Sequence, residues 1–238
     1  MKYKAIIFDL YGTLVDSFSF NECKNMLSRM SIILGLKPTE FINEWLDSYE
    51  MRMLGKLKGT KENIEYICDK NGKKVSEEKV KKAVKISFDS YKKELKPRKN
   101  YIKMLNRLIG LEYKLGLISD CSYETIKVWK SSQLSKIFKE PVFSAEVGIR
   151  KPDIRIYQIA CDRLNVEPGQ CIYIGDGGSY ELTGAANAGM MPIKIQAPHE
   201  MSDDTYKVDE DKRECRIIKS IDELFDLDLL KPGVCADE

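Results

Sequence analysis

The chain is organised around residues 5–16, which read AIIFDLYGTLVD. The first four residues of this stretch are apolar, and such a run is typical of a strand buried on both faces of a parallel sheet. Asp9 follows directly, just before a turn at Gly12. A buried carboxylate is costly unless a cation or hydrogen bonds receive it, and open parallel sheets bind ligands at the carboxyl ends of their strands. Asp9 is therefore the first candidate for a functional site.

The composition excludes several function classes. The 39 Lys and Arg residues nearly balance the 37 Asp and Glu residues, so no strong net field favours nucleic acid or an anionic membrane. No apolar run approaches the roughly 20 residues of a membrane span, and the start MKYK leads into a strand rather than a signal peptide. We therefore expect a cytoplasmic protein, monomeric or homodimeric, with a small-molecule substrate and no nucleic-acid or membrane partner.

The cysteines and the single histidine argue against two common mechanisms. The seven cysteines are scattered and form no Cys-x-x-Cys pair, so we interpret them as reduced thiols, most of them buried. His199 lies in a loop-like run, which leaves a Ser-His-Asp or Cys-His mechanism with one poor candidate for its base.

Strands and helices alternate along most of the chain. Apolar runs typical of buried strands recur after the first one, and helical patterns separate most of them. This alternation predicts an α/β fold with a Rossmann-like parallel sheet covered on both faces. A Ser-x-x-Glu pattern at Ser220 and Glu223 predicts a last helix opened by a capping box. The later predicted strands are 115–118, 141–143, 171–174, 192–195 and 217–218.

One long segment interrupts this alternation. The apolar residues of 17–95 recur at helical spacing, as in the stripe that runs from Ile42 through Trp45 to Met53. We expect a helical-bundle cap at 17–95, inserted into a core formed by 1–16 and 96–238. We interpret the Trp45 stripe as the interior of this bundle rather than a pocket.

The opening stretch resembles motif I of the haloacid dehalogenase superfamily, hydrolases whose first aspartate attacks the substrate and forms a covalent aspartyl ester. The resemblance implies that Asp9 is the nucleophile and that Gly12 and Thr13 belong to the substrate site. The phosphatase branch usually carries a second aspartate two places later, as general acid and base. Tyr11 stands there instead. Because tyrosine is common at this position in the branch that removes halide from 2-haloacids, motif I leaves the reaction open.

Two later stretches resemble motifs II and III of the same superfamily. The strand at 115–118 is followed by Ser119 and Asp120. The resemblance implies that the Ser119 hydroxyl holds the transferring group, whereas Asp120 stands where asparagine is more usual and adds a charge that must be neutralised or turned away. Lys151 precedes Pro152, which suits the first turn of a helix. The resemblance places the Lys151 ammonium in the site, where it would keep Asp9 ionised and offset the charge of a phosphate.

The sequence GDGGSYE, residues 175–181, resembles motif IV. Metal-dependent members of the superfamily place acids at the positions of Asp176 and Glu181. The resemblance implies a Mg²⁺ site formed by Asp9, Asp176 and the backbone carbonyl of Tyr11, with Glu181 binding through water or directly.

These motifs predict a hydrolase of this superfamily with an inserted helical cap. Since the metal-free dehalogenase branch typically lacks the acid represented by Asp176, we expect Mg²⁺-dependent hydrolysis of a phosphomonoester through an aspartyl-phosphate on Asp9. The alternatives are a 2-haloacid dehalogenase that uses Asp9 without metal, and a non-catalytic protein that binds a phosphorylated metabolite. Tyr11 is a weak substitute for a carboxylic acid, so alkyl phosphates should turn over slowly unless a cap residue supplies the proton, and acyl or aryl phosphates need protonation least.

Overall fold

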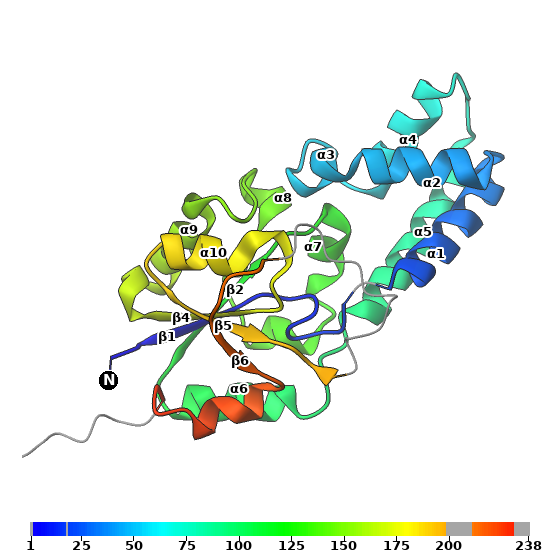
Figure 1. Ribbon diagram of the computed structural model, residues 1–238. Helices are drawn as coiled ribbons and strands as arrows, with labels where there is room; N and C mark the ends of the chain where they lie inside the picture. Colours follow the sequence, from blue (N-terminus) through cyan, green and yellow to red (C-terminus); the bar gives the residue numbers. More distant parts are fainter. Residues whose placement is uncertain (1, 18, 199–210, 231–238) are drawn as a thin grey trace, which may run out of the picture.

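The structure is a computed structural model and describes residues 2–17, 19–198 and 211–230 (Figure 1). Its centre is a six-stranded sheet in the order β3-β2-β1-β4-β5-β6, and every neighbouring pair of strands is parallel. The predicted α/β class is therefore confirmed. The strands are β1 (Ala5–Phe8), β2 (Lys114–Ser119), β3 (Val142–Phe143), β4 (Cys171–Gly175), β5 (Met191–Ile195) and β6 (Arg216–Ile218).

The apolar run of β1 forms the middle of this sheet because both of its faces are covered. Side chains alternate along a strand, so Ile6 and Phe8 pack into one cluster with Leu105 on one face. Ile7 packs with Tyr157 on the other face. The core helices are α6 (Tyr101–Gly110), α7 (Tyr123–Trp129), α8 (Ser144–Val147), α9 (Ile154–Leu164) and α10 (Glu181–Asn187).

Five helices lie between β1 and α6 and project away from the sheet as a separate layer (Figure 1). They share a third apolar cluster, which includes Leu27, Trp45 and Ile64. The domain limits 17–95 stay a prediction. The helices are α1 (Phe20–Leu34), α2 (Pro38–Asp47), α3 (Tyr49–Met53), α4 (Thr60–Lys70) and α5 (Glu77–Glu94).

Arg98 bonds to the two chain segments that connect the helical layer with the core. Its guanidinium donates to Asp16 Oδ1 at 2.9 Å and to the Thr13 carbonyl at 3.1 Å. Its backbone N–H donates to the Leu14 carbonyl at 3.0 Å. Since Arg98 is 9% exposed, these bonds fix the point where the chain leaves the core and the point where it returns.

Three local predictions were wrong. The Ile42-to-Met53 stripe is two helices rather than one, because the chain breaks at Ser48, whose hydroxyl donates to the Trp45 carbonyl at 2.8 Å. Pro152 is not in a helical turn, since α9 begins at Ile154 after an Asp153 cap that accepts from the Arg155 N–H.

The predicted capping box at Ser220 is also absent. The Ser220 hydroxyl pairs with Asp222, and a short 3₁₀ helix (Ile221–Asp226) replaces the α-helix. The Glu223 carboxylate accepts from the Lys219 N–H at 3.0 Å instead of the Ser220 N–H that a capping box requires. His199 and Cys235 lie outside the described residues. No helix of the described part of the chain is long and apolar enough to cross a bilayer.

Candidate active site

Asp9 and Lys151 form a buried ion pair at the carboxyl end of the sheet. Asp9 directly follows β1, and its N–H donates to the Ile174 carbonyl of the neighbouring strand at 2.8 Å. Lys151 Nζ donates to Asp9 Oδ1 at 2.6 Å, and the two residues are 4% and 5% exposed. A buried ammonium at this distance holds the carboxylate in one orientation. The predicted pairing of Lys151 with Asp9 is thus present.

Glu181 shares the same ammonium. Lys151 Nζ donates to Glu181 Oε2 at 2.5 Å, and the Tyr173 hydroxyl donates to the same oxygen at 2.8 Å. Glu181 Oε1 accepts from the Gly177 N–H at 2.8 Å. Both carboxylate oxygens are therefore engaged by the protein. Gly175 permits this arrangement, because a Cβ at that position would lie 2.2 Å from Glu181 Oε1.

Asp176 follows β4 and completes the acidic cluster. Its Oδ1 accepts from the Gly178 N–H at 3.0 Å. The motif I turn lies against its other oxygen: Gly12 has a φ of +75°, and a Cβ there would lie 2.4 Å from Asp176 Oδ2. Glycine is required at position 12 both by its backbone angle and by this close approach. The loops after β1 and β4 can therefore bring their two carboxylates together.

The cluster holds more acids than ammonium groups. One carboxylate oxygen from each of Asp9, Asp176 and Glu181 lies within 4.8 Å of the others, and Lys151 supplies a single ammonium. Burial raises the pKa of Asp9 to about 6 and that of Glu181 to about 8, against the attraction of Lys151. Burial alone would lower the pKa of Lys151, but Asp9 and Glu181 outweigh it and raise that pKa well above its ordinary value.

These residues fit a divalent cation. When all three buried carboxylates are ionised, the single ammonium leaves two negative charges uncompensated, and carboxylate oxygens are ligands that Mg²⁺ prefers. Asp9 and Asp176 would hold the ion. The predicted role of Glu181, binding the ion through water or directly, stays a prediction; both of its oxygens accept hydrogen bonds, from Lys151, Tyr173 and Gly177.

The loop after β2 explains how the protein accommodates the unusual Asp120. Its Oδ1 accepts from the Lys151 N–H at 3.0 Å, and Arg150 Nε lies 3.9 Å from its Oδ2. Arg150 also donates to Glu50 of α3 at 3.3 Å. The extra charge is thus turned toward the motif III backbone and a guanidinium, and the same guanidinium links the core to the helical layer.

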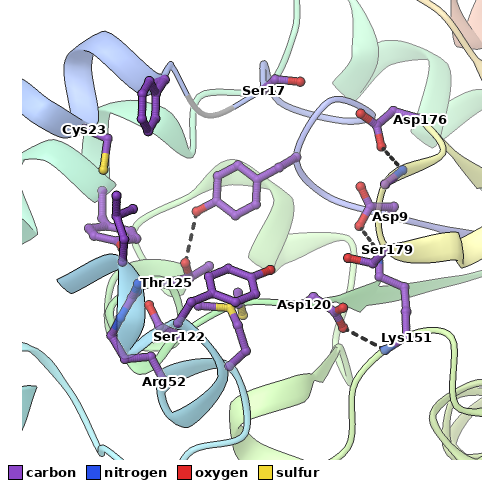
Figure 2. A pocket seen from close by; sticks show the side chains of 18 of the residues that line it. Asp9, Ser17, Cys23, Arg52, Asp120, Ser122, Thr125, Lys151, Asp176 and Ser179 are labelled. Atoms are coloured by element: carbon purple, nitrogen blue, oxygen red, sulfur yellow. Dashed lines mark hydrogen bonds and ion pairs between the residues drawn. The ribbon is translucent and has the colours of Figure 1, made fainter. Parts of the chain in front are cut away.

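A cavity of about 220 Å³ lies between the acidic cluster and the helical layer (Figure 2). Asp9, Lys151, Asp120 and Asp176 line one side of it, and Cys23, Arg52, Ser122 and Thr125 lie on the other. Trp45, Leu46 and Met53 also line it, so the interpretation of this stripe as bundle interior alone was incomplete.

The remaining predicted residues lie around this cavity. Ser119 and Thr13 are fully buried and do not line it, and neither side-chain oxygen has a hydrogen-bond partner within the described ranges. Tyr11 lines the cavity, and its hydroxyl is 3.0 Å from Thr125 Oγ1. Thr125 is across the cavity from Asp9 in Figure 2, so the phenol is directed away from the acidic cluster.

Comparison with known proteins agrees with this geometry. Residues 3–189 match the model of the haloacid dehalogenase-like hydrolase family. The chain belongs to this family. It is therefore a hydrolase of this family, and the family inferred from the sequence is confirmed.

Relatives of this hydrolase include members of two activity classes. A glyceraldehyde 3-phosphate phosphatase of Methanopyrus kandleri is 29% identical over 199 residues, covering 81% of this chain and 84% of the relative. An (S)-2-haloacid dehalogenase of Burkholderia cepacia is 25% identical over 204 residues, covering 81% of this chain and 82% of the relative. A solved 2-haloacid dehalogenase from Pseudomonas syringae shares the fold, with a TM-score of 0.69 at 19% identity, covering 94% of this chain and 97% of the neighbour.

Three polar residues around this hydrolase's site were missed by sequence reasoning. Arg98 bonds to the two connecting segments, and Arg150 links Asp120 to Glu50. Asp211 fixes the motif IV loop: its N–H donates to the Gly177 carbonyl at 2.7 Å, and its carboxylate accepts from the N–H and hydroxyl of Thr183. Arg150 had a signal, since it stands beside Lys151. Arg98 and Asp211 had none, because each is far in sequence from the residues it fixes.

Proposed function

We propose that this hydrolase cleaves phosphomonoesters in a Mg²⁺-dependent reaction in which Asp9 is the nucleophile. The observation that carries the proposal is the buried cluster of three acids, Asp9, Asp176 and Glu181, around the single ammonium of Lys151. When ionised, these carboxylates repel an incoming phosphate unless a cation is bound. A reaction without metal gives no reason for Asp176 to be held beside Asp9.

The chain's own residues have separate tasks in this reaction. Asp9 Oδ attacks phosphorus, and the bond from phosphorus to the leaving oxygen breaks. Lys151 orients the Asp9 carboxylate and offsets negative charge as the phosphoryl group arrives. Water then attacks the aspartyl-phosphate, which releases phosphate and regenerates the carboxylate. Bound Mg²⁺ supplies charge neutralisation for the transferring group.

The remaining assignments belong to the same proposal. Ser119 is proposed to hold the phosphoryl oxygens because it ends β2 at the carboxyl edge of the sheet, although its fully buried hydroxyl does not line the cavity. Gly12 and Thr13 shape the turn beside Asp176, and the Tyr11 carbonyl would be a further oxygen ligand.

The substrate is a small phosphorylated molecule, as the relatives named glyceraldehyde 3-phosphate phosphatase suggest. Residues 17–95 are proposed as the cap, and the six described cysteines, all free, support a cytoplasmic location.

Parallel assays of an aryl phosphate and of 2-chloropropionate, each with Mg²⁺ and with a chelator, test this function. We expect only the phosphate to be cleaved, and only with Mg²⁺. Halide release that resists the chelator and disappears in Asp9→Asn would instead establish the dehalogenase alternative. If neither compound reacts but a phosphorylated metabolite binds in the presence of Mg²⁺, the protein is a binding module.

A further inference from the structure

The cavity beyond the acidic cluster lacks a carboxylic acid placed to protonate a leaving group. Its carboxylate lining within the described residues consists of Asp9, Asp120 and Asp176. Asp9 is the proposed nucleophile, and Asp176 belongs to the cation cluster. Asp120 is bound to the Lys151 N–H and faces Arg150. Each acid therefore has a partner or a task other than the leaving oxygen.

Tyr11 does not replace the missing acid. Its hydroxyl lies 3.0 Å from Thr125 Oγ1, and Thr125 belongs to α7, on the opposite side of the cavity from Asp9 (Figure 2). A proton donor must come within hydrogen-bond reach of the oxygen it protonates, and that oxygen departs from a phosphorus held beside Asp9. The Tyr11 ring therefore acts as a wall of the cavity.

The part of the cavity wall that the helical layer forms is mostly apolar, with Arg52 as its charged side chain. Aromatic and aliphatic side chains from the helical layer make up much of the lining, among them Phe20, Trp45, Leu46, Tyr49, Met53 and Tyr91. A polyhydroxylated body placed against these side chains would leave hydroxyl groups without partners, which is unfavourable. A flat ring or a short acyl chain has no such hydroxyl groups and can pack against these side chains.

We propose that the substrates of this hydrolase are phosphates of acidic, largely apolar leaving groups, namely phenols or carboxylic acids. The inference rests on the proposed function and narrows it. Asp9 displaces the leaving group, which departs as a phenolate or carboxylate and takes its proton from solvent rather than from the protein. Water then hydrolyses the aspartyl-phosphate, so the overall products are inorganic phosphate and the free phenol or acid.

A leaving-group series tests this proposal. The probes are substituted phenyl phosphates of graded phenol acidity, one alkyl phosphate, and the matched pair phenyl phosphate and benzoyl phosphate, all with Mg²⁺. We expect kcat/KM to rise steeply with leaving-group acidity and the alkyl phosphate to react at least about a hundredfold more slowly than phenyl phosphate. If kcat/KM for benzoyl phosphate lies above the line that the phenyl phosphates define, the natural substrates are acyl phosphates. If it lies on or below that line, they are aryl phosphates.

Two variants sharpen the test. Tyr11→Asp should make kcat/KM depend less steeply on leaving-group acidity. It should also raise alkyl phosphate turnover by about 10²- to 10⁴-fold, because it restores a carboxylic acid at this position. Tyr11→Phe should keep the wild-type slope whatever its overall rate, because the phenol donates no proton to the leaving group. A shallow slope in Tyr11→Asp alone, with a steep slope in the other two proteins, is the pattern that supports the inference.

Other results would overturn it. A shallow wild-type slope with efficient alkyl turnover contradicts this substrate class but leaves the phosphatase function intact. If Asp120→Asn then makes the slope steep, Asp120 is the missing acid. If none of the phosphates is cleaved in an Asp9-dependent reaction, the proposed function itself fails.

Discussion

The two ends of the cavity are built on different principles. At the core end, hydrogen bonds to carboxylates hold Asp9, Asp176, Glu181 and Lys151, and two nearby glycines leave no room for a side chain. At the cap end, Trp45, Leu46 and Met53 present apolar surface from helices. From this difference we infer that the core end would determine which bond is broken, whereas the cap end would determine which molecule binds.

Asp9→Asn should have the largest effect. The amide cannot form the aspartyl ester, so we expect activity on an aryl phosphate to fall by more than about 10⁴-fold. Steady-state release of phosphate measures this loss. Asp89→Asn, on the exposed side of α5, is the matched control and should retain activity. Equal activity in the two variants would show that Asp9 is not the nucleophile.

Asp176→Asn should follow in size. It removes one charge from the cation cluster but keeps the shape of the side chain, so we expect kcat to fall by about 10²- to 10³-fold. The Mg²⁺ concentration needed for half-maximal activity should rise as well, and a Mg²⁺ titration measures it. An unchanged Mg²⁺ requirement would show that Asp176 does not bind the metal.

Leu46→Ser should weaken the binding of the substrate's leaving group without changing the core end of the cavity. Loss of apolar contact in the cavity corresponds to about 1–2 kcal/mol, so KM for an aryl phosphate should rise roughly 5- to 30-fold. The inhibition constant of inorganic phosphate should stay constant, because phosphate occupies the core end alone. Leu111→Ser is the control, since Leu111 is 43% exposed and Leu46 39%. Weaker phosphate inhibition in Leu46→Ser would contradict the division of the cavity.

Glu94→Gln should have the smallest effect, on stability. Burial raises the pKa of Glu94 from 4.5 to about 8, so the folded chain retains a proton that the unfolded chain loses, and stability falls as pH rises through this window. Glu94→Gln removes this loss. Its free energy of unfolding, relative to wild type, should therefore be about 1–3 kcal/mol more favourable at pH 9 than at pH 5.

Thermal melts of Glu94→Gln and wild type at both pH values measure the difference. Glu77→Gln, whose side chain is 70% exposed, provides the control. A stabilisation that is equal at pH 5 and pH 9 would show that Glu94 does not titrate with a raised pKa.

Much of the core could be predicted from the sequence because its signals are local. Each buried strand is an apolar run, and Asp9 and Asp176 directly follow such runs. The orientation of Tyr11 could not be predicted, because its hydroxyl pairs with Thr125, 114 positions away. The cavity wall at Trp45 was hidden for a similar reason: helical spacing shows that a side chain is buried, but not whether it faces another helix or a substrate.

Covalent trapping tests the central claim most directly. The protein is mixed with an aryl phosphate and Mg²⁺, quenched in acid within the first turnover, digested and analysed by mass spectrometry. We predict a phosphoryl adduct on the peptide that contains Asp9, absent in the presence of a chelator and absent in Asp9→Asn. Phosphate release that continues in Asp9→Asn, with no adduct on the wild-type peptide, would contradict the account.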